Sequence, residues 1–104
     1  MSDYIKVAAE GDVAEGQAKV FEANDARVVL CKVEGKCYAI ADVCTHDGGP
    51  LGEGDLDGYE IICPRHGARF DVRTGAVLAF PAIMPVASYP VMVADGEVLV
   101  KIDE

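Results

Sequence analysis

The chain has 104 residues, with nine basic and eighteen acidic side chains and a net charge of −9 at pH 7. This length suits one domain, and the acidic balance argues against nucleic acid or an anionic membrane surface as a partner and favours a basic protein. Apolar residues make up 51% of the chain and come in short runs, which argues against disorder and against a transmembrane helix.

Residues 1–6 lack the basic region and the long apolar run of a secretory signal. We therefore expect a cytoplasmic protein, in which thiols stay reduced. The four cysteines of the chain are then expected to be metal ligands or small buried residues before they are considered as disulfides.

The first half of the chain predicts a β-meander, because runs of strand-favouring residues alternate with turn residues. A two-residue turn at Glu34 and Gly35 predicts a tight hairpin. In that hairpin Lys32 faces Cys37, so Cys31 and Cys37 are not opposite each other, and we expect two small buried thiols without a disulfide or a chemical role. The expected strands are 4–8, 18–22, 26–33 and 36–41, with a loop over 10–17 and a turn at 24–25.

The second half predicts further short strands. A hairpin with its turn at 55–58 is expected to place its second strand directly before Cys63. The two prolines of 80–85 exclude a helix interior, so this segment is expected to be an irregular covering loop. Extended segments are expected at 59–62, 69–72, 89–94 and 97–102, with a hairpin turn at Asp95 and Gly96. Since no segment has a helical period, the fold class expected is all-β, a barrel or sandwich of about eight to ten short antiparallel strands.

Candidate metal ligands are concentrated between residues 43 and 71, which hold the only two histidines of the chain. Cys44 and His46 form a Cys-x-His pair, and sixteen intervening residues separate it from the Cys-x-x-His pair of Cys63 and His66. Each pair lies in a short segment rich in glycine and proline, which can direct both side chains to one point. Two thiols and two imidazoles suit a metal centre with soft and borderline ligands.

Two kinds of centre satisfy this ligand set. Structural zinc commonly uses two Cys and two His, because it is tetrahedral and needs no open position. Three features favour an iron–sulfur cluster: the chain has no Cys-x-x-Cys knuckle, each pair combines one Cys with one His, and glycine-containing turns follow both pairs. Backbone N–H groups in such turns suit bridging sulfides, which accept hydrogen bonds. A zinc-stabilised interaction module is the alternative.

At these residues the chain resembles the Rieske [2Fe–2S] family, which has the same two ligand motifs at this spacing. The resemblance extends beyond the ligands and covers most of the chain. The further matching residues are Thr45, Gly48, Pro50 and Leu51, then Pro64, Gly67, Phe70 and Asp71, and later Pro81, Pro85, Tyr89, Pro90, Val91, Asp95 and Gly96.

The resemblance implies one [2Fe–2S] cluster in which each iron has one kind of protein ligand. The implied ligands are Cys44 and Cys63 on one iron and His46 and His66 on the other. The resemblance also implies a single Rieske-like domain over 1–104, with a smaller cluster-binding subdomain at about 43–83 inserted between β-rich terminal parts. Histidine ligation leaves the oxidised cluster with a formal charge of about zero, which raises its potential relative to a four-thiolate cluster.

Four positions separate the chain from the high-potential respiratory members of that family. Those members carry an extra Cys in each ligand segment, and a Ser and a Tyr that donate hydrogen bonds to sulfur. The corresponding residues here are Gly49, Arg65, Ala68 and Phe70. Because each missing donor would have favoured the reduced cluster, we expect a potential near the low end of the family's range, about −150 mV.

The resemblance implies a soluble ferredoxin that carries single electrons and is not an enzyme. Both histidines are committed to the cluster, so no site with two His and a carboxylate can hold a second iron, and the chain has no G-x-G-x-x-G dinucleotide fingerprint. The implied partners are an NAD(P)H-dependent flavoprotein reductase and a terminal aromatic ring-hydroxylating oxygenase. The chain is expected to be a monomer that docks transiently with each of them. The small Rieske-like subunit of an assimilatory nitrite reductase is a second alternative, although members of that group often lack ligands that this chain keeps.

Four acidic residues near the ligands in the sequence are candidates for steering a basic docking patch. They are Asp47, Glu53, Asp55 and Asp57. Their other interpretation is that they are solvated loop acids without a partner.

Overall fold

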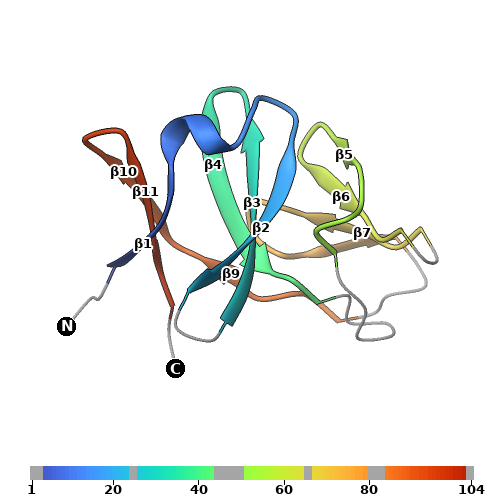
Figure 1. Cartoon of the computed structure of the whole chain (residues 1–104). Helices are drawn as coiled ribbons and strands as arrows, with labels where there is room; N and C mark the ends of the chain where they lie inside the picture. The colour runs from blue at the N-terminus through green and yellow to red at the C-terminus, as the bar shows by residue number, and fades with distance from the viewer. Residues whose placement is uncertain (1–3, 24–25, 44–50, 65–66, 80–83, 103–104) are drawn as a thin grey trace.

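The computed structural model describes residues 4–23, 26–43, 51–64, 67–79 and 84–102 (Figure 1). These residues form eleven strands and one 3-10 turn, with no α-helix among them, so the predicted all-β fold is confirmed. No helix in this part of the chain is long and apolar enough to span a membrane. The elements are β1 (Tyr4–Ala9), η1 (Glu10–Asp12), β2 (Ala18–Ala23), β3 (Ala26–Val33), β4 (Lys36–Ala41), β5 (Leu56–Asp57), β6 (Glu60–Ile62), β7 (Arg69–Asp71), β8 (Val77–Ala79), β9 (Ser88–Tyr89), β10 (Val91–Ala94) and β11 (Glu97–Lys101).

The strands form three antiparallel sheets, with strand orders β1-β11-β10, β2-β3-β4-β9 and β5-β6-β7-β8. The first two sheets combine strands from both ends of the chain, whereas the third comes from the continuous segment 56–79. In Figure 1 this third sheet lies to the right of the other two. In the chain, Cys44 and His46 therefore precede this sheet, and Cys63 and His66 fall between its strands β6 and β7.

The predicted strands at 26–33 and 36–41 are confirmed with the same bounds. Two further strands, β8 and β9, were not predicted, because each has only two or three residues and is defined by its pairing with β7 or β4. The turn predicted at 55–58 instead occupies the two residues between β5 and β6. The predicted turn at 24–25 and residues 80–83 of the predicted covering loop lie outside the described residues.

Both predicted two-residue hairpin turns are confirmed. Glu34 and Gly35 have φ values of 52° and 79°, and Asp95 and Gly96 have values of 53° and 76°, as the turn that suits a twisted hairpin requires. A positive φ is unusual for glutamate. At the first turn the carboxylate of Glu15 accepts hydrogen bonds from the N–H groups of Glu34 (2.7 Å) and Gly35 (2.9 Å). The bond from Gly35, followed by that from Glu34, lowers the pKa of Glu15.

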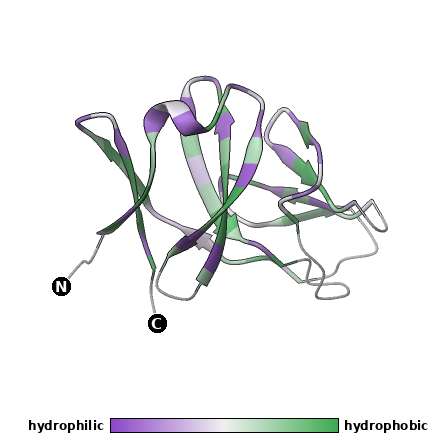
Figure 2. Cartoon of the chain, viewed as in Figure 1, coloured by the Kyte–Doolittle hydropathy of each residue, from purple (hydrophilic) through white to green (hydrophobic). Residues whose placement is uncertain are grey.

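Strand β3 is buried on both faces and separates two apolar cores. Val29, Cys31 and Val33 belong to the core shared with β6 and β7, whereas Val28 and Leu30 belong to the core shared with β11. Figure 2 shows hydrophobic residues along the strands and hydrophilic ones at η1. The alternation follows from the two-residue period of a strand.

The two cysteines of β3 and β4 lie on opposite faces of their sheet. Cys31 belongs to the first core and Cys37 to the second, and Cys37 pairs with Lys32 as predicted. Both are free thiols, and their positions in different cores agree with the expectation that they form no disulfide. Burial, with a smaller contribution from Cys37, raises the pKa of Cys31 to about 12. A thiol in that environment stays protonated and unreactive.

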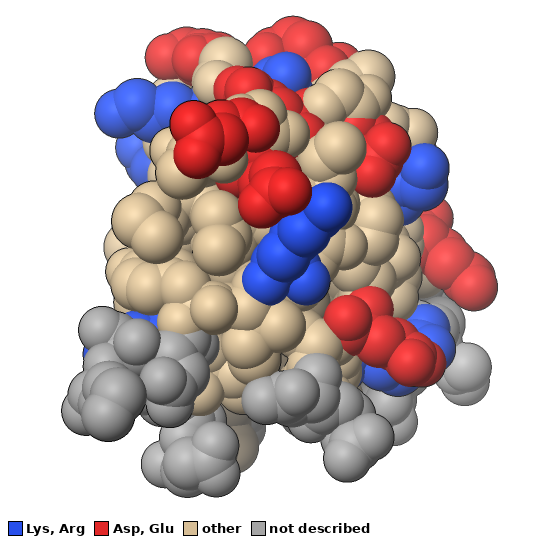
Figure 3. Space-filling model, turned by 60° about the vertical axis from the view of Figure 1, so that its left-hand side comes forward, with Lys and Arg blue, Asp and Glu red and all other residues tan. Residues whose placement is uncertain are grey.

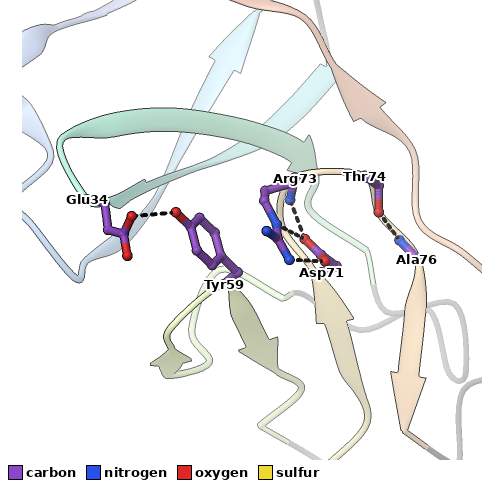
Figure 4. A network of polar contacts seen from close by, with 6 residues as sticks. All are labelled: Glu34, Tyr59, Asp71, Arg73, Thr74 and Ala76. Atoms are coloured by element: carbon purple, nitrogen blue, oxygen red, sulfur yellow. Dashed lines mark hydrogen bonds and ion pairs between the residues drawn. The ribbon is translucent and has the colours of Figure 1, made fainter.

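A network of side chains joins the small third sheet to the turn between β3 and β4 (Figure 4). The hydroxyl of Tyr59 donates to Glu34 at 2.9 Å, and its ring lies edge-on to Tyr38 at a centroid distance of 5.9 Å. The guanidinium of Arg73 lies 4.0 Å from the centre of the Tyr59 ring and forms an ion pair with Asp71 at 2.9 Å. The third sheet is thereby attached to the second at the end near this turn.

Candidate metal centre

One of the four predicted ligands lies in the described part of the chain. Cys63 follows β6 directly, whereas Cys44, His46 and His66 lie outside the described residues. Within the described ranges no three His, Cys, Asp or Glu side chains come together as a metal site. The ligand set therefore stays a prediction, and the structure bears on the backbone and side chains that surround it.

Cys63 is held at the base of a closed turn. Its N–H donates to the carbonyl of Ala68 at 2.7 Å, and its own carbonyl accepts from the N–H of Gly67 at 3.0 Å. Gly67 has a φ of +80°, which explains the glycine at this position. The turn thus pairs both backbone polar groups of Cys63 within the protein, through two hydrogen bonds that do not involve its sulfur.

The surroundings of Cys63 are apolar. The cysteine is only 1% exposed, it is a free thiol, and it belongs to the same core as Leu51, Ile61 and Phe70, each 0% exposed. A thiolate in such surroundings is costly unless a cation lies beside it. This donor and its apolar environment therefore fit ligation of a thiophilic metal or an iron–sulfur cluster.

Asp42, which follows β4, is a site residue that sequence reasoning missed. Its side chain is 0% exposed. One carboxylate oxygen, Oδ1, accepts from the N–H groups of Leu51 (2.9 Å) and Gly52 (2.7 Å), and the other, Oδ2, pairs with the guanidinium of Arg27 at 3.0 Å. Asp42 therefore fixes both ends of 43–50, the segment that contains Cys44 and His46.

Residues 51–55 connect this first ligand segment to the second. The N–H of Gly54 donates to the carbonyl of Leu51 at 2.9 Å, and the N–H of Ile62 donates to the carbonyl of Asp55 at 3.0 Å. A Cβ atom at Gly54 would lie 1.9 Å from the carbonyl oxygen of Ile62, so only glycine allows this approach. Since Ile62 precedes Cys63, residues 51–55 are joined to the strand that leads to this cysteine.

The acidic candidates for docking differ in their surroundings. The carboxylate of Asp57 pairs with Arg69 at 3.1 Å, and Arg69 also pairs with Glu60 at 3.1 Å. Glu53 and Asp55 are exposed, and neither forms an ion pair within the described residues. Asp47 lies outside those residues. Glu53 and Asp55 are therefore the described acids best placed to meet a basic partner.

Large apolar side chains are exposed in the chain around the ligand segments. Val43 is 37% exposed directly before Cys44, Leu78 is 47% exposed on β8, and Met84 is 62% exposed before β9. A hydrogen bond of 2.9 Å from the N–H of Ala41 to the carbonyl of Ala87 extends the pairing of β4 with β9 toward Val43 and Met84. Exposed apolar groups near a site are typical of a protein contact surface.

The chain matches one protein family, and it is similar along almost its whole length to proteins of known systems. The model of the Rieske [2Fe–2S] domain matches residues 3–90. The chain is 36% identical to the ferredoxin component of the naphthalene 1,2-dioxygenase/salicylate 5-hydroxylase systems of a Ralstonia species, over 97% of each protein. It is 38% identical to the ferredoxin component of the p-cumate 2,3-dioxygenase system of Pseudomonas putida, over 98% of this chain and 88% of the relative.

Solved structures agree with this match. The ferredoxin of carbazole 1,9a-dioxygenase from Nocardioides aromaticivorans IC177 is 35% identical, with a TM-score of 0.90 over 93% of this chain and 95% of that one. A chain in the complex of reduced oxygenase and oxidised ferredoxin of carbazole 1,9a-dioxygenase is 36% identical, with a TM-score of 0.87 over 94% of this chain and 92% of that one. A nitrite reductase small subunit from Mycobacterium tuberculosis has a TM-score of 0.88 over 100% of this chain and 98% of that one, but it is only 18% identical and shares the fold alone.

Proposed function

The chain belongs to the Rieske [2Fe–2S] domain family, and we propose that it carries single electrons from an NAD(P)H-dependent flavoprotein reductase to a terminal aromatic ring-hydroxylating oxygenase. The observation that supports this most strongly is its 36–38% identity, along almost its whole length, to proteins named as ferredoxin components of dioxygenase systems. The family assignment gives the chain one Rieske-type [2Fe–2S] cluster in place of zinc. When bound, this cluster supplies reversible one-electron chemistry.

The proposed ligands are Cys44 and Cys63 on one iron and His46 and His66 on the other. The position of Cys63 directly after β6, with its N–H bonded to Ala68 and its carbonyl to Gly67, supports its part in this assignment. Leu51, Ile61 and Phe70 would exclude water from the thiolate side. Residues 43–83 would be the cluster-binding part of a single domain, in agreement with the sheet that 56–79 form.

The proposed docking surface surrounds the ligand segments. Val43, Leu78 and Met84 would supply apolar contact, and Glu53 and Asp55 would supply local charge. A small surface of this kind suits transient docking by a monomer. The free thiols of Cys31 and Cys37 are in keeping with a reducing compartment such as the cytoplasm.

Other acidic side chains lie far from this surface. In Figure 3 acids gather at the upper end of the molecule, where η1 and the turn between β3 and β4 lie in Figure 1. Strand β4 runs from that turn toward Val43, a distance of roughly 20 Å for a strand of this length. Because salt screens charges beyond about 8 Å under physiological conditions, these distant acids would contribute little to docking at the ligand segments.

The proposal is tested on the purified protein with three measurements. We expect a brown protein, a Rieske-type EPR signal after reduction with dithionite, and turnover of an aromatic substrate only when a flavoprotein reductase, this protein and a terminal oxygenase are combined. A colourless protein that contains zinc would contradict the cofactor. A stable complex with a large sirohaem subunit, without transfer to an oxygenase, would contradict the role.

Docking steered by charge predicts that reduction by the reductase slows as salt rises. We expect at least a threefold fall in the second-order rate constant between ~0.05 M and ~0.5 M salt, because screening weakens attraction between exposed charges. The double variant Glu53→Gln with Asp55→Asn should show a lower rate at low salt and a weaker salt dependence. Asp95→Asn, at the turn between β10 and β11, is the control that should behave as the native protein. A rate independent of salt would disprove this steering.

Phe70→Tyr is expected to raise the midpoint potential by about 60 mV. Phe70 lies in the core that contains Cys63, and a hydroxyl that donates a hydrogen bond to cluster sulfur favours the reduced, more negative form by about 1.4 kcal/mol, which corresponds to about 60 mV for one electron. Ala68→Ser should shift the potential in the same direction. Phe21→Tyr, next to the other core, is the control, and protein-film voltammetry is the measurement. Unchanged potentials in both core variants would contradict the proposed low-potential design.

A further inference from the structure

We infer that Asp42 is a positioning residue for the cluster, acting by joining the residues that precede and follow the first ligand segment. The inference rests on the proposed ligands Cys44 and His46, which lie between Asp42 and Leu51 in the chain. Asp42 contributes no ligand. Its carboxylate joins the residue before the segment to the two residues after it.

Both carboxylate oxygens of Asp42 have hydrogen-bond partners. Its Oδ1 accepts from the N–H groups of Leu51 and Gly52, at 2.9 and 2.7 Å. Its Oδ2 accepts from Nε of Arg27 at 3.0 Å and lies 3.0 Å from Nη2 of the same side chain. Hydrogen bonds to an ionised acceptor are among the stronger ones in proteins. A fully buried carboxylate with all its partners present holds them in one geometry.

The contact of Asp42 with Leu51 and Gly52, here called the clamp, is anchored in the sheet β2-β3-β4-β9. The N–H of Asp42 donates to the carbonyl of Arg27 at 3.0 Å, which extends the pairing of β3 with β4 by one residue. Both the backbone and the side chain of Asp42 are therefore fixed to Arg27. Leu51, on the other side of the segment, is 0% exposed in the core that contains Cys63.

Gly52 permits this contact. A Cβ atom there would lie 2.0 Å from Cγ2 of Val20 and 3.3 Å from Oδ1 of Asp42. The backbone at Gly52 therefore passes between β2 and the carboxylate with no room for a side chain. Glycine at position 52 therefore allows the backbone to come close enough to Asp42 for the hydrogen bond to form.

The chain contains a matched device at a turn that holds no predicted ligand. The carboxylate of Glu15 also accepts from two consecutive N–H groups, those of Glu34 and Gly35, at 2.7 and 2.9 Å. Removing either carboxylate deletes the same number of backbone hydrogen bonds. A comparison of the two therefore tests whether the loss of two backbone hydrogen bonds is enough to release the cluster, and the unfolding temperatures account for the further ion pair of Asp42 with Arg27.

The test compares Asp42→Ala, Asp42→Asn and Glu15→Ala in the cluster-loaded protein. The readouts are the rate at which visible absorbance is lost in the presence of a chelator, the line shape of the EPR signal after dithionite, and thermal unfolding by circular dichroism. We expect Asp42→Ala to lose its cluster at least tenfold faster and to give broadened EPR lines. Tenfold corresponds to about 1.4 kcal/mol.

The other two variants are expected to lose the cluster more slowly than Asp42→Ala. Asp42→Asn should be several-fold faster than the native protein, because its carbonyl oxygen can still accept from both N–H groups while its amide nitrogen can no longer pair with Arg27. Glu15→Ala should lower the unfolding temperature without changing the rate of cluster loss. Equal rates for Asp42→Ala and Glu15→Ala, or loss in Asp42→Asn as fast as in Asp42→Ala, would overturn the inference.

Two further results complete the test. If Asp42→Ala does not fold, Arg27→Gln replaces it, since it leaves Oδ1 of Asp42 to accept from both N–H groups but removes the ion pair with Oδ2. It should lose the cluster several-fold faster than Glu15→Ala, and an equal rate would overturn the inference. Native protein without a Rieske EPR signal would disprove the proposed cofactor, whereas a native signal with unaffected variants would disprove the clamp alone.

Discussion

Cys63→Ala is expected to abolish both the visible absorbance and the EPR signal of the cluster. The proposed ligand set has two thiolates, and alanine removes one of them without introducing a new polar group. The side chain is buried next to Leu51 and Phe70, so water cannot readily replace the sulfur as a ligand. Iron and sulfide content of the purified variant, with its absorption spectrum, is the measurement.

Cys31→Ala is the matched control for this experiment. Cys31 is also a buried free thiol of the same apolar core, and it is not a proposed ligand. The same change there should lower the free energy of unfolding by about 1 kcal/mol and leave iron content and spectrum intact. Full cluster content in Cys63→Ala, or its loss in Cys31→Ala, would disprove the proposed roles of these two cysteines.

Gly54→Ala is expected to destabilise the protein by about 3 kcal/mol. The added Cβ would lie 1.9 Å from the carbonyl oxygen of Ile62 and 3.2 Å from that of Leu51. Both obstacles are backbone atoms, so the conflict requires 51–55 and β6 to separate. For a domain of this size the midpoint of thermal unfolding should fall by roughly 12–24 °C, measured by far-UV circular dichroism.

Gly11→Ala controls for the loss of glycine flexibility. A Cβ at Gly11 meets nothing within 4 Å, and the residue lies in η1. We expect its stability to stay within about 0.5 kcal/mol of the native value. Equal unfolding temperatures for Gly54→Ala and Gly11→Ala would show that 51–55 can move away from Ile62 at little cost.

The parts of the fold that could be predicted are those that residues adjacent in the sequence determine. In the turns at 34–35 and 95–96 the second residue is glycine, which adopts the positive φ that a tight hairpin turn requires, so both turns could be predicted from two neighbouring residues. Strands β8 and β9 could not be predicted, since a strand of two or three residues carries no period and exists through its partner. The turn between β5 and β6 was misplaced, because Asp55 and Gly58 both favour turns.

The candidate site was predictable in its ligand motifs and not in its supports. Cys63 could be found from its motif, while Asp42 gave no signal, because its role depends on Arg27, Leu51 and Gly52, which are distant from it or from one another in the sequence. The pairing of Asp57 with Arg69 was hidden for the same reason. The positions of Cys44, His46 and His66 remain predictions from the sequence.

The turn at Glu34 and Gly35 determines more than the shape of a hairpin. Both faces of β3 are apolar, so hydrophobicity alone would tolerate a shift of β3 by one residue, and the turn is what prevents it. The same alignment brings Asp42 opposite Arg27, at the far end of β4. Inserting or deleting one residue in the turn would point the carboxylate of Asp42 to the wrong face. A two-residue turn roughly 20 Å away thus sets the position of Asp42, which bonds Leu51 and Gly52 beyond the first ligand segment.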